Sequence, residues 1–201
     1  MFTGIVTDIG RIESVEERGD RCLRIACAYD METLDLGASI ACSGACLTVV
    51  DKGKGWFAVD ISAETANRTA PGMWEEGGRL NLERSLKLGD ELGGHIVTGH
   101  VDGVGEIVAA AGEGGSTRIA VEAPAALAPY IAEKGSIALD GVSLTVTMVE
   151  PSGEGGVRFG LNLIPHTAEA TTFDRVEQGR NVNIEIDILA RYLERLVASR
   201  T

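Results

Sequence analysis

The sequence predicts an all-β protein that consists of two copies of one small antiparallel unit, followed by a single helix. The first observation is a duplication, because residues 37–50 (GASIACSGACLTVV) return in similar form at 134–147 (KGSIALDGVSLTVT). The second is that each copy divides into about six short segments of mostly alternating apolar residues, separated by Gly, Asp or Lys. The third is an amphipathic stretch at 188–198, which lies outside the repeat.

The duplication extends over both halves of the chain. Residues 2–12 (FTGIVTDIGRI) match 97–107 (VTGHVDGVGEI), and residues 56–66 (WFAVDISAETA) match 158–168 (RFGLNLIPHTA). The matching blocks occur in the same order, which predicts two units with a common scaffold. The expected units are residues 1–94, residues 95–187 and a terminal segment at 188–201.

About six short strands in each copy predict a small antiparallel barrel or sandwich, because these architectures leave few exposed strand edges. The chain shows no alternation of strands with long helices, so a doubly wound parallel sheet is not expected. Short helical turns are expected at 31–36 and at 123–133, where prolines interrupt the pattern.

Composition limits the possible partners. The 201 residues are 44% hydrophobic and carry a net charge of −12, which is typical of a folded, soluble chain and argues against nucleic acid or anionic membranes as partners. The N-terminus lacks a basic region followed by an apolar one, and the uncharged stretch 36–50 is too short to span a bilayer. We therefore expect a cytoplasmic protein.

The cysteine and histidine spacings do not predict a metal site. All four cysteines lie before residue 47 without a Cys-x-x-Cys pair, so free thiols are expected rather than disulfides or structural zinc. His95 and His100 are five residues apart, which in a strand would place them on opposite faces. The chain also lacks the glycine-rich motifs that bind phosphate.

The terminal stretch predicts a helix with one apolar face. This face needs a partner, either the chain's own barrel or the same helix in neighbouring subunits, because so short a helix is marginal alone in water. We favour oligomerisation, since the helix lies outside the repeat. The expected apolar residues are Ile188, Leu189, Tyr192, Leu193, Leu196 and Val197.

The two repeats carry different polar side chains at equivalent positions. Cys46 in the first copy corresponds to Ser143 in the second, and Thr48 and Thr145 follow two residues later on the same strand face. Cys46 is either a small buried residue or a nucleophile or proton carrier with a lowered pKa. The threonines are either strand residues that point inward or hydrogen-bonding ligands of a polar heterocycle.

Four further positions break the symmetry between the copies. His100 occupies the position of Ile5 and is either a surface residue or an acid–base group. Asp187, Asp140 and Lys134 are likewise either solvated side chains or parts of a site.

Six motifs together resemble the α-type riboflavin synthase family, which is built from two lumazine-binding repeats. They are MFTGIV, SGACLTV, GGHIVTGHVDG, DGVSLTV, IPHTAEATT and NIEIDILARYLERL, and the resemblance runs from Met1 to about Leu196. It implies two six-stranded Greek-key barrels and a C-terminal helix that holds a homotrimer. It also implies a cofactor-free, metal-free transferase that converts two molecules of 6,7-dimethyl-8-ribityllumazine into riboflavin and 5-amino-6-ribitylaminouracil. The resemblance leaves an association with lumazine synthase open.

The resemblance also implies the residues of two pockets, with Phe2 and Thr3 covering the site. The expected first-barrel pocket contains Gly4, Ile5, Val6, Cys46, Leu47, Thr48, Asp60, Ile61, Ser62, Ala63, Glu64 and Thr65. The expected second-barrel pocket contains Gly99, His100, Val101, Lys134, Ser143, Leu144, Thr145, Asn162, Leu163, Ile164, Pro165, His166 and Thr167.

In the family the active site forms where the first barrel of one subunit faces the second barrel of its neighbour. By resemblance, His100 with Ser143 and Asp187 activates the nucleophile that adds to one lumazine. Cys46 and Thr48 hold the other ring and assist deprotonation of its methyl group. Ser43, Ala66 and Ala70 depart from the family pattern and affect the expected contacts of the first pocket's outer loop.

Two other kinds of protein share parts of this pattern. A non-catalytic lumazine- or flavin-binding protein would keep the architecture but lose polar groups from one pocket, whereas Cys46, His100, Ser143 and Asp187 are all present here. A flavin-nucleotide reductase barrel would need a basic phosphate site and a nucleotide-binding domain, neither of which the sequence shows.

Overall fold

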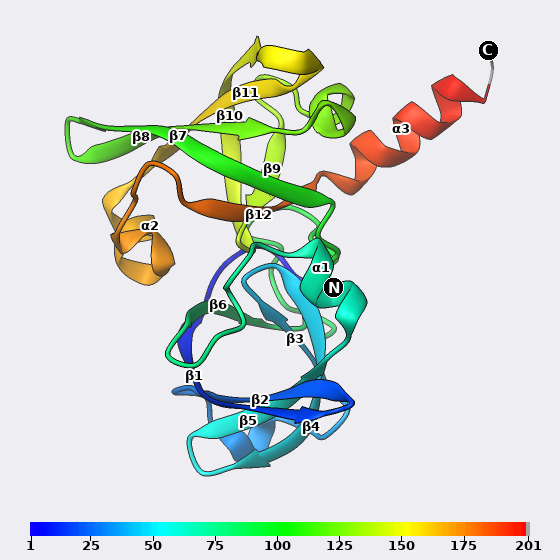
Figure 1. Cartoon of the computed structure of the whole chain (residues 1–201), viewed down its shortest axis with the longest axis vertical. Coiled ribbons are helices and arrows are strands. Elements are labelled where there is room, and N and C mark those ends of the chain that lie inside the picture. Colours follow the sequence, from blue (N-terminus) through cyan, green and yellow to red (C-terminus); the bar gives the residue numbers. More distant parts are fainter. Residues whose placement is uncertain (200–201) are drawn as a thin grey trace.

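The computed structural model describes residues 1–199, and its strands close into two six-stranded antiparallel barrels (Figure 1). The barrels lie one above the other, and the C-terminal helix projects away from the second barrel. Residues 200–201, which belong to the expected segment 188–201, lie outside the described residues. The predicted fold class, with two homologous barrels and a terminal helix, is confirmed.

The first barrel has the Greek-key order β1-β2-β5-β4-β3-β6, in which every neighbouring pair is antiparallel. Its strands are β1 (Asp8–Arg18), β2 (Asp20–Ala26), β3 (Ser39–Cys42), β4 (Ala45–Gly53), β5 (Trp56–Ile61) and β6 (Arg79–Arg84). Its helical turns are η1 (Met31–Thr33) and α1 (Ala63–Arg68).

The second barrel repeats this order as β7-β8-β11-β10-β9-β12. Its strands are β7 (Gly103–Glu113), β8 (Ser116–Ala123), β9 (Ser136–Leu139), β10 (Val142–Pro151), β11 (Val157–Leu163) and β12 (Asn181–Ile186). Its helical turns are η2 (Ala125–Tyr130), η3 (Gly153–Gly155), α2 (Pro165–Ala170) and η4 (Thr172–Asp174).

The expected helical turns at 31–36 and 123–133 are present as η1 and η2. The helices α1 and α2 were not expected from the sequence. α1 begins after Ser62, whose hydroxyl accepts a hydrogen bond from the Thr65 amide, and α2 begins with Pro165, which suits a first helical position.

Alternation along the strands separates a core face from an outer face. On β4, Leu47 and Val49 are buried in the first barrel, whereas Thr48 is exposed and Cys46 is half-buried. On β10, Leu144 is buried and Thr145 is exposed in the same way. The interpretation of the two threonines as inward-pointing residues is therefore wrong, and the residues around Cys46 and Ser143 form the outer surface of their barrels.

Equivalent residues of the two copies meet at the junction between the barrels. Phe2 and Val97 form an antiparallel bridge, with N–H···O distances of 2.7 and 3.0 Å. Gly44 and Gly141 also face each other, because an added Cβ atom at Gly44 would lie 2.9 Å from the Gly141 nitrogen. The two barrels are thus related by a local two-fold axis at this junction.

Two buried asparagines extend this symmetric junction. The Asn81 amide group donates to the Asp140 carbonyl at 2.9 Å, and its oxygen accepts from the Thr172 N–H at 2.8 Å. In the same way, Asn183 donates to the Ser43 carbonyl at 2.8 Å and accepts from the Ala70 N–H at 2.7 Å. Each asparagine therefore fixes the backbone of the other copy.

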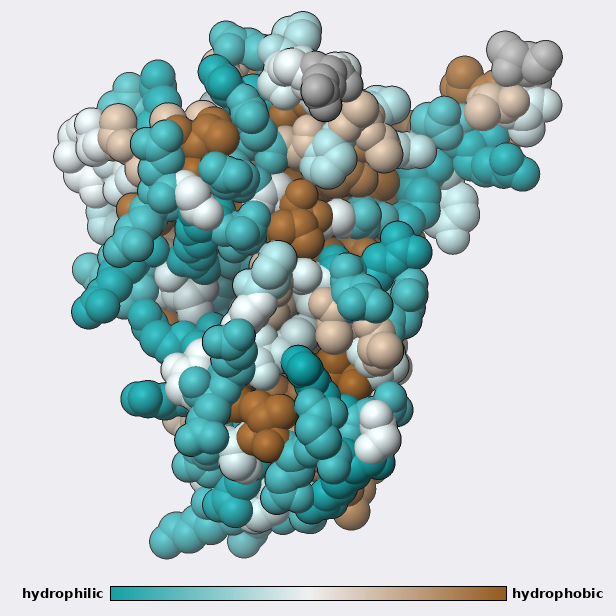
Figure 2. All heavy atoms as spheres, in the orientation of Figure 1, coloured by the Kyte–Doolittle hydropathy of each residue, from teal (hydrophilic) through white to brown (hydrophobic). Residues whose placement is uncertain are grey.

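The helix α3 (Ile188–Ala198) begins at the N-cap Asp187, which accepts from the Leu189 N–H at 2.9 Å. Arg191 anchors it to the second barrel through Asp102, at 2.7 Å. The helix stands clear of the barrels with apolar side chains on its surface (Figure 2). Most of the expected apolar face is indeed exposed, namely Leu189, Tyr192, Leu193, Leu196 and Val197. Within residues 1–199, none of the helices could cross a membrane.

One ion pair at the junction is buried, and it generates the first testable prediction. Arg180 bonds Asp140 at 2.8 Å, and Asp140 is only 7% exposed. Burial raises the pKa of Asp140, and the Arg180 charge opposes this shift. Arg180→Ala would leave the buried carboxylate without its cation, so we expect a loss of about 3 kcal/mol in the free energy of unfolding, measured in urea.

The exposed pair of Arg79 and Asp174 provides the matched control. Arg79→Ala should cost less than about 1 kcal/mol, because solvent screens exposed ion pairs. Equal losses for the two variants would contradict the importance of the buried pair.

Candidate active site at the junction of the barrels

The segment before the first strand of each copy lies against the Cys46 or Ser143 strand of the other copy. The Gly4 carbonyl accepts from the Ser143 N–H at 2.8 Å, and the Gly99 carbonyl accepts from the Cys46 N–H at 2.8 Å. Both glycines have positive φ, and an added Cβ atom would lie 2.6 Å from the Ser143 Cβ or 2.5 Å from the Cys46 Cβ. Only glycine fits at these two positions.

This crossing corrects the expected division of residues between the pockets. The segment Gly4–Val6 was expected in the first-barrel pocket, but Gly4 lies against Ser143 and Val6 packs on the core of the second barrel. The segment Gly99–Val101 was expected in the second-barrel pocket, but it lies against Cys46, and Val101 packs on the core of the first. The physical cause is the bridge at the local two-fold axis, which brings each segment to the opposite barrel.

A cavity of about 380 Å³ brings Cys46 and His100 together. The His100 N–H donates to the buried carboxylate of Glu185 at 3.1 Å, and its side chain is exposed. Within one chain His100 therefore belongs to the Cys46 site, and its expected grouping with Ser143 across subunits stays a prediction. The lining includes Cys46, Thr65, Thr69, Gly99, His100 and Asp102.

His95, which the sequence interpretation did not include in the site, lies beside Ser143. Its Nδ1 is 2.7 Å from the Ser143 Oγ, the residue is only 9% exposed, and Nε2 is buried without a hydrogen-bond partner among residues 1–199. Burial lowers the pKa of His95, and the negative charge of Asp187 opposes this shift. The structure therefore assembles a neutral imidazole, a hydroxyl and a nearby carboxylate at the second barrel.

Sequence comparison of the repeats could not find His95. The offset of 95 residues that aligns Phe2 with Val97 places the partner of His95 before Met1, so no asymmetry could be scored. The Gly93-Gly94 pair before His95 was the one signal in the sequence, because consecutive glycines often mark a close approach of backbone segments. The structure shows such an approach: a Cβ atom at Gly94 would lie 2.1 Å from the Thr3 carbonyl oxygen and 2.8 Å from the Ser143 Cβ. His95 also lies in a loop segment, not in the strand that the sequence analysis considered.

The other expected site residues divide into three groups. Phe2 and Thr3 are 0% and 5% exposed and form part of the junction, and their expected role of covering the site stays a prediction. Four side chains point into the barrel cores, namely Leu47, Ile61, Leu144 and Leu163. The outer surfaces carry Ile5, Thr48, Asp60, Ser62, Ala63, Glu64 and Thr65 in the first copy, and Lys134, Thr145, Asn162, Ile164, Pro165, His166 and Thr167 in the second.

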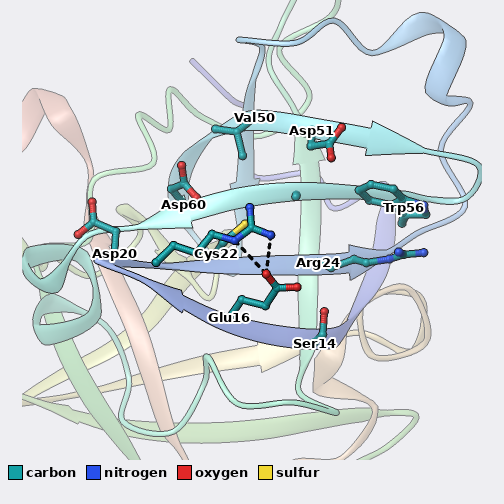
Figure 3. Close-up of a pocket in the computed structure, with 11 residues that line it drawn as sticks. Ser14, Glu16, Asp20, Cys22, Arg24, Val50, Asp51, Trp56 and Asp60 are labelled. Atoms are coloured by element: carbon teal, nitrogen blue, oxygen red, sulfur yellow. Dashed lines mark hydrogen bonds and ion pairs between the residues drawn. The ribbon is translucent and has the colours of Figure 1, made fainter.

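A larger groove of about 630 Å³ lies on the outer face of the first barrel, over β1, β2, β4 and β5 (Figure 3). Arg18 and Glu16, two residues apart on β1, pair at 2.9 Å, and the Arg24 guanidinium lies 4.1 Å from the centre of the Trp56 ring. Asp60 is the one expected site residue in its lining. Because Arg18 and Arg24 are both exposed and each forms an ion pair with a glutamate, the groove is a weaker candidate than the Cys46 cavity.

The thiols differ in their surroundings. All four cysteines are free, and burial raises the pKa values of Cys22, Cys27 and Cys42, which keeps these thiols protonated at neutral pH. Cys46 is the cysteine that lines the cavity with His100. Among residues 1–199, no three metal-binding side chains converge on one point.

Known proteins of similar sequence and structure identify the family of this chain. The model of the lumazine binding domain matches residues 3–85 and 98–187. A riboflavin synthase of Brucella abortus is 52% identical over 98% of both chains, and one of Mycobacterium bovis is 46% identical over 99% of both. The crystal structure of LumP complexed with riboflavin superposes with a TM-score of 0.78 and 26% identity, covering 92% of this chain and 99% of that one. The chain belongs to the riboflavin synthase family, with one lumazine binding domain in each barrel.

Proposed function

We propose that the protein is a transferase that converts two molecules of 6,7-dimethyl-8-ribityllumazine into riboflavin and 5-amino-6-ribitylaminouracil. Relatives named riboflavin synthase match the chain over nearly its whole length. The observation that carries the proposal is the pair of non-equivalent polar sites at matched positions, Cys46 with His100 and Ser143 with His95. Two identical substrates with different roles need two sites with different chemistry.

The polar groups suit an uncharged substrate with a sugar-alcohol chain. The outer strand surfaces near the two sites carry Thr48, Ser62, Thr145 and Asn162, whose side chains can donate to and accept from ribityl hydroxyls. Arg68, which also lines the cavity, is paired with Glu64 at 2.8 Å. Neutral hydrogen-bonding groups thus lie near the sites and the Arg68 charge is already paired, which suits a ligand without phosphate.

The reaction transfers four carbons from one lumazine to the other, so the carbon that the acceptor gains is lost by the donor and no external oxidant or reductant is needed. The C7 methyl group of a lumazine is acidic because its anion is delocalised into the ring. We assign its deprotonation to Cys46 and Thr48, with His100 in the lining of the same cavity as Cys46. Orientation of the two rings contributes the remaining rate enhancement.

At the second site, His95 takes the role that was expected for His100. A neutral His95, held in place by the Ser143 hydroxyl, can accept the proton that the nucleophile loses as it adds at C7 of the other lumazine. Asp187 would stabilise the imidazolium that forms, since its charge acts on His95. The buried Nε2 without a partner leaves this imidazole one bonding position for a ligand or water.

We also propose a homotrimer with its active sites between subunits. Within residues 1–199 the lining of the Cys46 cavity includes neither Ser143 nor His95, so the two sites do not share one cavity in a single chain. The first barrel of one subunit would meet the second barrel of its neighbour, and the exposed apolar face of α3 would hold the subunits together. This gives units of 1–94, 95–187 and 188–201, in a cytoplasmic enzyme.

A non-catalytic lumazine- or flavin-binding protein is the second candidate, because the LumP structure with riboflavin has the same fold. Such a protein is expected to have lost polar groups from one of the two sites. Here both sites keep their groups, and the relatives named riboflavin synthase are the more similar in sequence. The observations favour the enzyme.

The activity itself provides the second prediction. Purified protein incubated with 6,7-dimethyl-8-ribityllumazine should form riboflavin, measured by its absorbance, and Cys46→Ser should lower kcat roughly a hundredfold while the fold is kept. Cys22→Ser is the matched control, since burial raises the pKa of this thiol and it lies outside the cavity. If the lumazine binds but is not converted over hours, the enzyme proposal is wrong and the proposal of a non-catalytic binding protein takes its place.

The buried imidazole provides the third prediction. Because the pKa of His95 is lower in the folded chain than its ordinary value of 6.5, the unfolded chain binds the proton more readily. The stability that comes from neutral His95 is thus present above about pH 6.5 and lost as the pH falls through the lowered pKa. In urea unfolding at about pH 7.5 and about pH 5, His95→Gln should lose less stability on acidification than the wild type. The same loss in both proteins would contradict a buried neutral His95.

The terminal helix provides the fourth prediction. Leu193→Glu places a charge in the exposed apolar face of α3, so the protein should change from trimer to monomer in light scattering after size exclusion. Arg195→Ala, two residues later on the exposed surface, should leave the trimer intact. A Leu193→Glu protein that stays trimeric would show that α3 does not hold the subunits.

A further inference from the structure

Two buried carboxylates occupy equivalent positions in the two barrels. Glu83 on β6 is 5% exposed and Glu185 on β12 is 3% exposed, although neither forms an ion pair with a Lys or Arg side chain among the described residues. A buried carboxylate is costly unless donors surround it. Their donors therefore indicate what these residues do.

The donors come from the segments that cross the junction. Glu83 accepts from the Thr3 N–H at 2.6 Å, the Thr3 hydroxyl at 2.7 Å and the Gly4 N–H at 2.9 Å. Glu185 accepts from the Thr98 N–H and hydroxyl at 2.6 Å each, and from the Gly99 N–H at 2.9 Å. Both carboxylates thus hold the same two consecutive peptide groups, with charge-assisted hydrogen bonds.

Glu185 makes one contact that Glu83 lacks. It also accepts from the His100 N–H at 3.1 Å, whereas the equivalent Ile5 N–H donates to the Thr3 hydroxyl instead. The extra bond fixes the backbone of a residue that lines the cavity with Cys46. The carboxylate with the additional hydrogen bond, Glu185, is thus the one whose segment contributes a polar residue, His100, to a candidate site.

The held glycines then contact the reactive residues of the opposite barrel. Gly99, bonded to Glu185 through its N–H, bonds the Cys46 N–H through its carbonyl. Gly4, bonded to Glu83, bonds the Ser143 N–H in the same way. A shift of either segment would move the backbone against which Cys46 or Ser143 is placed.

We propose that Glu185 and Glu83 are positioning residues that act across the junction, Glu185 on Cys46 and His100 of one site, and Glu83 on Ser143 of the other. Each carboxylate therefore controls a reactive residue of the barrel to which it does not belong. The effect of these carboxylates on catalysis rests on the proposed function, whereas their effect on the positions of Cys46, His100 and Ser143 does not.

Glu→Gln substitutions test the hydrogen bonds while the side chain keeps its size. A glutamine has one acceptor oxygen, and its NH₂ group would face N–H donors of the same segment. The reporter is the rate at which iodoacetamide alkylates Cys46, resolved by mass spectrometry of peptides, with Cys22 as the internal standard. Steady-state kcat and KM with 6,7-dimethyl-8-ribityllumazine are measured on the same proteins.

Glu185→Gln should change the alkylation rate of Cys46 relative to Cys22 by about tenfold and lower kcat about 10- to 100-fold, with a smaller change in KM. Glu83→Gln should leave the Cys46 rate within about twofold of wild type, although Glu83 shares a barrel with Cys46. A merely structural role predicts the reverse order, because loosening of the first barrel would expose its own cysteine more.

Thr98→Val and Thr3→Val are milder variants, since each removes one hydroxyl donor and keeps the backbone bonds to the carboxylate. Thr98→Val should change the Cys46 rate in the same direction as Glu185→Gln, and Thr3→Val should not, which keeps the test decisive if a glutamine variant fails to fold. An unchanged Cys46 rate in Glu185→Gln and Thr98→Val, or an equal change in the Glu83 and Thr3 variants, would overturn the proposal. Because alkylation needs no turnover, these outcomes are separate from a failure of the wild type to make riboflavin.

Discussion

The arrangement of both candidate sites depends on the antiparallel bridge between Phe2 and Val97. These are equivalent residues, so the bridge fixes the local two-fold axis between the barrels. From this point each chain segment continues into contact with the opposite barrel, where Gly4 meets Ser143 and Gly99 meets Cys46. Without the bridge, each barrel would still have its closed sheet, but neither site would have its backbone wall.

Within this symmetric frame the polar side chains differ in a consistent way. The frame is formed by residues that are the same in both copies, such as Asn81 and Asn183 with their crossed amide bonds. The differences occur beside it, where a thiol and an exposed histidine line one cavity and a hydroxyl bonds a buried imidazole in the other site. A scaffold of this kind gives its two sites different chemical surroundings on one symmetric backbone frame.

The sequence predicted the barrels and the terminal helix because their signals are local. Alternation in β4 and β10 and the apolar stripe of α3 depend only on neighbouring residues. The crossing of Gly4 and Gly99 could not be predicted, since it arises from a contact between segments 95 residues apart. His95 was missed because a comparison of repeats detects differences only where both copies have a residue. Short helices such as α1 depend on a single cap, Ser62, which is a weak signal in a strand-rich chain.

The facing glycines at the axis have a consequence for how the two halves can change over evolutionary time. Gly44 and Gly141 lie so close that a side chain on either would collide with the backbone of the other. Each glycine therefore limits which residues can replace the other, and this mutual restriction persists in both copies after the duplication. Cys46 and Ser143 also contact the other copy, but they do so through backbone N–H groups that any residue except proline supplies. A thiol can therefore stand in one copy and a hydroxyl in the other while the same backbone contact is kept.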